Sequence, residues 1–252
     1  NPQYTPDDLL TFYMVTGGVA KYAEQLVMQN AFTKEDIIRS VLGFGSYFIN
    51  EGRDVLSDEF GKEYGNYFSV LSSIANGYTS RGDITNDTGV ESGGYLAKLE
   101  TVYDLIERSK PYLSPEGTRN NRYYIKDNFM NFWFRFIYKY RSSIEFGNLE
   151  YVQQKVLADY ETYSGHILER YFRQKYQETG LYNIVTNYWE KGNTNEIDLI
   201  AVNEADKKVI VGECKRNHKR ISLNILQEKA GKLQAKQKKF AYNFVGLSLE
   251  DM

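Results

Sequence analysis

The pattern of apolar and polar positions divides the chain into a helical first part and a mixed last part. Apolar residues recur every three or four positions through residues 5–42, 67–108 and 152–178, which predicts amphipathic helices. Between residues 182 and 247 short apolar runs alternate with polar turns, which predicts strands. We therefore expect an α+β protein whose sheet lies in the last third of the chain.

Residues 1–65 are expected to form a small helical segment. Thr5, Pro6 and Asp8 have the pattern of a capping box with proline at the first helical position. The double glycine at Gly17 and Gly18 ends this helix. No residues of this segment suggest chemistry of their own.

Residues 66–147 are expected to form a second domain with the order of a winged helix, in which three helices precede a strand, a loop and a second strand. The third helix is predicted over residues 92–108 and the second strand over residues 122–125. The aromatic run at residues 129–140 has helical spacing and predicts core packing.

A winged helix offers a face for docking on DNA. The residues expected there are Ser92, Tyr95 and Lys98 on the outer side of the third helix, and Arg119 and Arg122 in the wing. Because Glu91 and Glu100 lie on the same helix, a structural role without DNA contact remains an alternative.

Residues 148–252 are expected to form a third domain with the element order αβββαβ. The helices are predicted over residues 152–178 and 223–237, and the strands over residues 182–189, 196–202, 209–215 and 240–247.

The two central strands of this domain bring acidic residues together. If Asn203 pairs with Lys208 across a four-residue loop, Asp198 lies opposite Glu213 and on the same face of the sheet. Two facing carboxylates repel each other unless a cation or a proton lies between them. We therefore expect a divalent metal at this position. In the same register Glu196 faces Lys215, so a salt bridge between them is an alternative role for that lysine.

Composition limits the function classes. The chain of 252 residues has a formal charge of -2, so any footprint for nucleic acid must be local. One cysteine excludes a disulfide framework and fits a reducing cytoplasm. No apolar run approaches the about 20 residues of a membrane span, so no membrane association is expected. Because the sequence begins with Asn1, we expect it to be a fragment of a longer protein.

Asp198, followed by Glu213-Cys214-Lys215 at the end of the next strand, resembles the bipartite motif of the PD-(D/E)XK nuclease superfamily. Ile197 stands where the name of the motif has proline. The resemblance implies that Mg²⁺ or Mn²⁺ is held by the two carboxylates and the backbone oxygen of Cys214. It also implies that Lys215 orients the attacking water or stabilises negative charge during hydrolysis of a phosphodiester.

The same superfamily takes a further glutamate from the first helix of the core, and Glu169 matches it by position. An exposed pair with Arg173 at the i+4 position is the alternative for this residue. Downstream cations, among them Arg216, Lys219 and Lys229, are expected to attract phosphate, although a solvated helix face would have the same composition.

Two stretches are similar to a family of prokaryotic AAA+-like ATPases. Residues 15–22 resemble the stretch that follows the nucleotide-binding core, with Ala20 in place of the usual proline. Residues 124–136 resemble the hallmark of the C-terminal region. No GxxxxGK[ST] motif occurs in this sequence, so the resemblance implies that ATP binds to an ATPase domain elsewhere in the same full-length protein.

Two functions remain open at this point. In the first, the chain is the DNA-handling part of an ATPase and cuts DNA at a metal-dependent site. In the second, the nuclease fold is an inactive module that binds nucleic acid or protein and regulates the ATPase.

Overall fold

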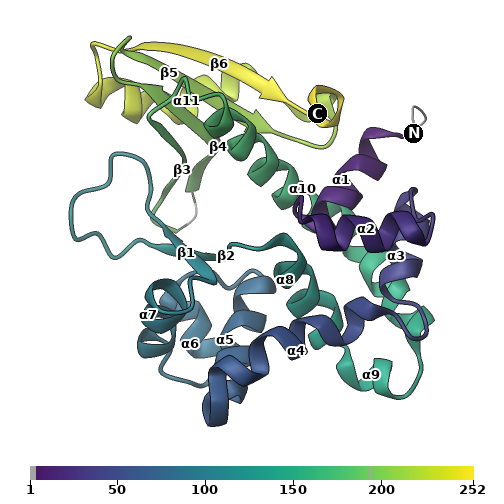
Figure 1. Ribbon diagram of the computed structural model, residues 1–252. Coiled ribbons are helices and arrows are strands. Elements are labelled where there is room, and N and C mark those ends of the chain that lie inside the picture. Colours follow the sequence, from purple (N-terminus) through teal and green to yellow (C-terminus); the bar gives the residue numbers. More distant parts are fainter. Residues whose placement is uncertain (1–3, 193) are drawn as a thin grey trace. The chain divides into compact units, whose positions relative to one another are not determined.

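The structure, a computed structural model, describes residues 4–192 and 194–252. The protein is α+β, and its chain forms two compact units (Figure 1). The first unit comprises residues 1–108 and 122–160, and the second comprises residues 109–121 and 161–252. None of the described helices combines the length and apolar composition that crossing a membrane requires.

The first unit is mostly helical. Its elements are α1 (Pro6–Thr16), α2 (Ala20–Met28), α3 (Lys34–Val41), α4 (Tyr47–Phe60), η1 (Gly61–Glu63), α5 (Tyr64–Ala75), α6 (Arg81–Thr88), α7 (Gly93–Thr101), β1 (Ile106–Ser109), β2 (Arg122–Ile125), α8 (Asn128–Phe132), the π-helix η2 (Trp133–Tyr138) and α9 (Arg141–Glu145). The predicted capping box of α1 is present, because the amide of Asp8 donates to the Thr5 hydroxyl over 3.2 Å and the Thr5 amide donates to the Asp8 carboxylate over 3.0 Å.

The prediction of one helix over residues 92–108 was wrong after Thr101. The chain turns at Asp104, which has a left-handed φ of 55°, and Ile106 begins β1, which pairs with β2. Leu105 continues the helical spacing in the sequence but lies beyond the helix. Its amide donates to the Leu99 carbonyl and so closes the end of α7.

The aromatic run is core, as predicted, but it is not a regular α-helix. Phe132, Trp133 and Phe134 are consecutive and all buried. In an α-helix of 3.6 residues per turn, three consecutive side chains point in widely different directions. Here the chain instead forms the wider π-helix η2, which begins at Trp133 within this run. Gly52 of α4 makes room for the indole, because a Cβ there would lie 2.3 Å from Cδ2 of Trp133.

The second unit contains the expected order of a helix, three strands, a helix and a strand. Its elements are the last part of α10 (Leu149–Glu178), β3 (Ile184–Glu190), β4 (Thr194–Asn203), β5 (Lys208–Cys214), η3 (His218–Arg220), α11 (Leu223–Lys236), β6 (Ala241–Leu247) and η4 (Leu249–Asp251). The sheet has the order β3-β4-β5-β6, in which only the β5–β6 pair is parallel.

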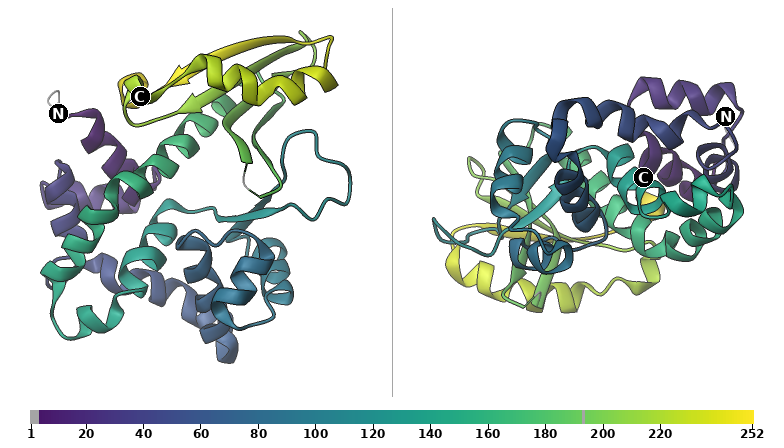
Figure 2. Two further views of the ribbon diagram at one scale, coloured as in Figure 1. Left: turned by 180° about the vertical axis from the view of Figure 1, so that it is seen from behind. Right: turned by 90° about the horizontal axis from the view of Figure 1, so that it is seen from below.

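Helices cover both faces of this sheet. The helix α11 lies on one face and the last part of α10 lies on the other (Figures 1 and 2). Leu226, Ala230 and Leu233 of α11 pack against residues of the central strands such as Val202 and Val211. This core holds the ends of β4 and β5, where the candidate site lies, in fixed positions.

The loop between β1 and β2, expected to be a wing, packs within the second unit. The Tyr112 amide donates to the Asn187 carbonyl of β3 over 3.2 Å, and its ring belongs to the core under α11. The Trp189 indole donates to Asn120 over 3.2 Å. These contacts anchor both ends of the loop on the sheet, whereas its tip at Pro115, Glu116 and Gly117 is exposed.

Candidate active site

The register of the central hairpin is the predicted one. The pairs run from Asn203 with Lys208 to Leu199 with Gly212. The ladder ends there, one residue before Asp198 and Glu213. The two acids therefore lie where β4 and β5 separate, although Glu213 still pairs with Gly246 of β6.

A bulge in β4 changes the direction of Asp198. Ile200 pairs with Thr186 and Ile197 pairs with Tyr188, so two residues of β4 face one residue of β3. Ile197 and Ile200 both reach the core under α11, which a regular strand would not allow for residues three apart. The predicted alternation from Glu196 to Val202 was therefore wrong, and the bulge is the reason.

The carboxylates of Asp198 and Glu213 converge on one cation, the Lys215 ammonium. Its Nζ lies 3.3 Å from Oδ2 of Asp198 and 3.0 Å from Oε1 of Glu213. The Cys214 amide also donates to Oδ2 of Asp198 over 2.9 Å, and Lys229 of α11 contacts Oε2 of Glu213 at 3.1 Å. Both acids therefore contact the same cation, which is a lysine of the protein itself.

Glu169 reaches the same group of charges from α10. Its carboxylate lies 3.7 Å from the His166 ring and 3.9 Å from Arg173, and its side chain is 24% exposed. Arg173 donates to the backbone carbonyl of Asp198 over 2.8 Å and so ties the helix to the bulge. Glu169 is therefore not the exposed helix residue of the alternative interpretation, although the contact with Arg173 exists.

Burial and charge shift the pKa values of these groups in different directions. Burial, and next the charge of Glu169, raise the pKa of Asp198 to about 6, although Lys215 and the Cys214 amide oppose the rise. Burial also raises the pKa of Glu169, but His166, Arg173 and Lys215 together hold it below its ordinary value. For Lys215, burial lowers the pKa, and the charges of Asp198 and Glu213 outweigh that effect and raise it. The lysine therefore stays charged while Asp198 titrates near neutral pH.

A cleft of about 450 Å³ opens beside these residues. It is lined by Glu161, Thr162, Gly165, His166, Glu169, Cys214, Lys215, Arg216, Asn217, Arg220 and Leu249. Arg216 is oriented by a 2.7 Å hydrogen bond to the buried hydroxyl of Ser164. Arg220 belongs to the downstream cations that were expected to attract phosphate, whereas His166 was not predicted for the site; its spacing of three residues before Glu169 was the available signal.

The predicted DNA-contacting residues of the second unit occupy different environments. Arg216 lines the cleft, and Lys219 is exposed on η3. Lys229 is instead bound to Glu213, so it is part of the charge cluster. Arg119 is exposed in the anchored loop.

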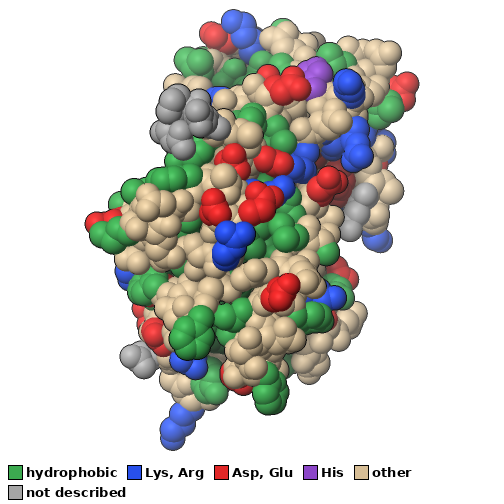
Figure 3. Space-filling model, turned by 90° about the vertical axis from the view of Figure 1, so that its right-hand side faces the viewer, with side chains coloured by type: hydrophobic (Ala, Val, Ile, Leu, Met, Phe, Trp, Pro, Cys, Tyr) green, Lys and Arg blue, Asp and Glu red, His purple; other side chains and the backbone are tan. Residues whose placement is uncertain are grey.

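The residues predicted for the first unit do not form one exposed face. Ser92 is fully buried and bonded to Thr85, so its placement on the outer side of the helix was wrong. The Tyr95 hydroxyl accepts a hydrogen bond from Asn66, Lys98 lies 3.8 Å from Glu63, and Arg122 is half-buried at the start of β2. On the face drawn in Figure 3, acidic and basic side chains are interspersed and do not form one basic surface.

The donor set fits a divalent cation in part. Two carboxylates already converge on one positive charge, which is the arrangement that a hard cation needs. Within residues 4–192 and 194–252, however, no group of three or more histidine, cysteine, aspartate or glutamate side chains could hold a metal ion. The Cys214 thiol adds no ligand, because it is buried and burial raises its pKa.

Comparisons with known proteins match most of the chain but carry no activity. Residues 133–239 match the family DUF234, described as archaea bacterial proteins of unknown function. The chain is also similar to an uncharacterized protein of Methanocaldococcus jannaschii, at 29% identity over 223 residues. The match covers 85% of this chain and 49% of that protein, so the chain spans about half the length of this relative. No solved structure gives a significant match.

Proposed function

We propose that the second unit carries a metal-dependent phosphodiesterase site that acts on DNA. The observation that supports it most is the convergence of the Asp198 and Glu213 carboxylates on one cation, Lys215, which lines a cleft together with Glu169. Carboxylates gathered at a strand end without a cation would repel each other. The arrangement is therefore suited to hold positive charge.

The residues that would hold Mg²⁺ or Mn²⁺ are Asp198, Glu213 and the backbone oxygen of Cys214. The ion, when bound, supplies a Lewis acid for water and a phosphate oxygen. Lys215 keeps its proton and contributes a positive charge that can stabilise the developing negative charge on the phosphate. Glu169 raises the pKa of Asp198, so the two acids act as a pair.

The cleft supplies contacts for the DNA backbone. Arg216 and Arg220 line it together with Lys215, and guanidinium groups bind phosphate oxygens through paired donors. Because the whole chain has a formal charge of -2, this local group of cations carries the electrostatic attraction for DNA.

The same proposal extends to the rest of the chain. Residues 66–147 would form a winged helix, since α5, α6 and α7 precede the β1–β2 pair, and residues 1–65 would form the lid-like segment of an AAA+-like ATPase. The ATPase domain would lie elsewhere in the full-length protein, in keeping with a relative about twice as long as the match. ATP would bind there.

A second candidate function is favoured by the charge balance of the site. Glu169, Asp198 and Glu213 are accompanied by three cations, namely Arg173, Lys215 and Lys229. A cluster already compensated in this way is stable without a metal. In this alternative the unit is an inactive nuclease-like module that binds nucleic acid or protein and regulates the ATPase.

Cleavage assays with the full chain, with and without the ATPase domain supplied, distinguish the two functions. We expect DNA to be cut in Mg²⁺ or Mn²⁺, and cutting to stop in chelator and in the Asp198→Asn and Glu213→Gln variants. Glu204→Gln, in the exposed turn of the same hairpin, is the matched control and should cut like the wild type. Equal activity of the wild type and the Asp198→Asn variant would refute the nuclease site and favour the binding module.

A further inference from the structure

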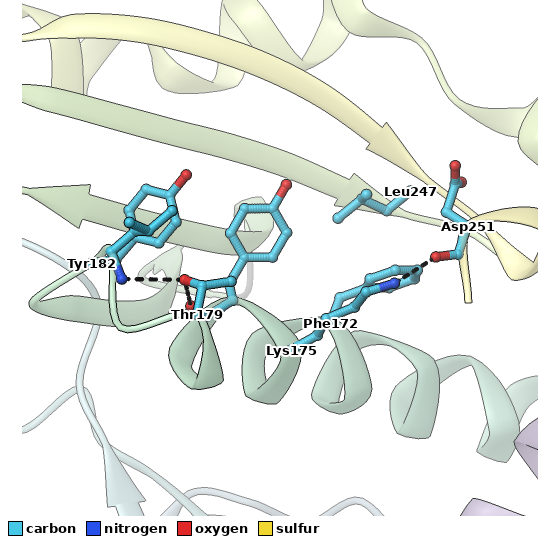
Figure 4. A pocket seen from close by; sticks show the side chains of 8 residues that line it. Phe172, Lys175, Thr179, Tyr182, Leu247 and Asp251 are labelled. Carbon is cyan, nitrogen blue, oxygen red and sulfur yellow. Dashed lines mark hydrogen bonds between the residues drawn. The ribbon is translucent and has the colours of Figure 1, made fainter.

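A second pocket lies beside α10, further along the helix from the cleft. It has a volume of about 300 Å³ and is lined by Phe172, Lys175, Tyr176, Thr179, Leu181, Tyr182, Leu247 and Asp251. Figure 4 shows that Tyr182 and Leu247 come from opposite sides of this space, one from the connection between α10 and β3 and the other from β6. Its volume is at the lower end of the range for small-molecule sites, which suits one ring system.

The walls of the pocket are aromatic and their edges are polar. Tyr176 and Tyr182 have ring centroids 5.6 Å apart at an angle of 41°, and the buried ring of Phe172 lies one turn before Tyr176. Burial, and next the neighbouring Tyr182, raise the pKa of Tyr176, so its hydroxyl remains a donor at neutral pH. Such a lining combines stacking surfaces with hydrogen-bonding groups, which is the chemistry of a nucleobase site.

Lys175 closes one end of the pocket and adds a positive charge. Its ammonium donates to the backbone carbonyl of Asp251 over 2.8 Å (Figure 4). The ammonium also lies 5.6 Å from the ring centroid of Tyr171 and 5.8 Å from that of Phe172, so its position is fixed on this side of the pocket. A phosphate next to a bound base would therefore meet a cation held at the rim.

The pocket and the cleft lie along one face of the same helix. His166 and Glu169 line the cleft, and Phe172, Tyr176 and Thr179 line the pocket, at intervals of three or four residues. Glu169 and Tyr176 are about 10 Å apart along the axis at 1.5 Å per residue. That length is about three times the 3.4 Å spacing of phosphates along one strand of duplex DNA, so the phosphate in the cleft and the base in the pocket would belong to different nucleotides.

We propose that this pocket binds one unpaired base of a DNA strand whose phosphate lies in the cleft. The choice of a nucleic-acid base rests on the proposed function of the cleft. A base inside the pocket is not paired or stacked in a duplex, so the substrate is single-stranded DNA or a frayed or flapped end rather than intact duplex.

Binding of a single-stranded oligonucleotide to the full chain tests the proposal in chelator, where no metal-dependent cleavage takes place. The oligonucleotide carries the fluorescent base 2-aminopurine at one position, which is moved along the strand. We expect quenching at one position, where the base stacks on tyrosine. Stacking contributes about 1–3 kcal/mol per base, so we expect Tyr182→Ala to weaken binding by roughly 5- to 150-fold and to abolish the quenching.

Two variants control for loss of fold and loss of apolar area. Tyr182→Leu keeps a large apolar side chain but removes the flat ring, and we expect it to lose the quenching as well. Phe146→Ala removes an aromatic ring that is 90% exposed and outside the pocket, and it should bind like the wild type.

The outcomes separate this proposal from the function of the cleft. Equal oligonucleotide affinity of Tyr182→Ala and the wild type, with no position-specific quenching in the wild type, would overturn the base pocket. The nuclease proposal would stand in that case if cleavage still depended on Asp198. Failure of the wild-type chain to bind the oligonucleotide would also overturn the base pocket, whereas the nuclease proposal is decided by the cleavage assay in Mg²⁺ or Mn²⁺.

Discussion

Replacing Asp198 by asparagine should stabilise the metal-free protein, and the gain should depend on pH. Asparagine has nearly the shape of aspartate, and its side-chain oxygen can still accept from the Cys214 amide. It removes the buried negative charge that lies next to Glu169. Lys215 keeps its contact with Glu213 at 3.0 Å, so the substitution leaves no lysine without a partner.

The magnitude follows from the pKa of Asp198, which rises from 3.8 to about 6 on folding. At 1.36 kcal/mol per pKa unit this corresponds to about 3 kcal/mol. Because the folded state holds the proton more tightly than the unfolded state, the wild type loses this stability as the pH rises from about 4 to about 6. Above about pH 6 the loss is complete and constant. The asparagine variant has no such loss.

Urea unfolding in chelator, measured across this pH range, is the assay. We expect the free energy of unfolding of Asp198→Asn, minus that of the wild type, to rise between about pH 4 and about pH 6 and then to level off. Asp206→Asn, in the exposed turn of the hairpin, controls for the loss of one negative charge. Parallel pH profiles of wild type and Asp198→Asn would refute the raised pKa and its cause.

Three further predictions concern packing, catalysis and DNA binding. Gly52→Ala should lower the free energy of unfolding, measured in urea, by about 1–3 kcal/mol, because the new Cβ would overlap Trp133. Gly65→Ala is the control and should not lower it, because a Cβ there meets no atom within 4 Å. Lys215→Ala should abolish cleavage. Mn²⁺ should still raise the melting temperature of this variant, because the carboxylates lose their shared ammonium but remain ligands. Loss of the Mn²⁺ effect would contradict this prediction. Arg216→Gln should reduce the slope of log K for DNA against log salt by about one, and an unchanged slope would place Arg216 away from phosphate.

The hairpin register could be predicted because two independent signals agreed. The polar turn fixed the pairing of Asn203 with Lys208, and the apolar alternation of β5 fixed that Val209 and Val211 face the core. The bulge could not be predicted, because no glycine or proline marks it. It arises where Ile197 and Ile200 both bury against α11, which is a tertiary preference that local spacing does not reveal.

The end of α7 is a second feature that could not be predicted from the sequence. Leu105 and Ile106 continue a helical spacing, and only the left-handed turn at Asp104 diverts them into a strand. Aspartate adopts that conformation more readily than most residues but does not require it. The buried position of Ser92 was equally hidden, because its hydroxyl is satisfied by Thr85 of α6, seven residues earlier in the chain, a contact that helical spacing does not reveal.

The bulge and Lys215 together explain how three acids can share one site before any ion binds. A regular β4 would aim Asp198 at the core under α11, where Val202 and Val211 leave no polar partner. The bulge instead turns Asp198 toward Glu169, and the resulting repulsion raises its pKa. Lys215 then offsets this repulsion by contacting Asp198 and Glu213 at once.

A site that is compensated by its own lysine folds without metal, and an incoming cation has to replace that lysine between the carboxylates. The affinity for Mn²⁺ should therefore be higher in Lys215→Ala than in the wild type, and calorimetric titration of both proteins measures the difference. Equal affinities would mean that metal and ammonium do not compete for the same position.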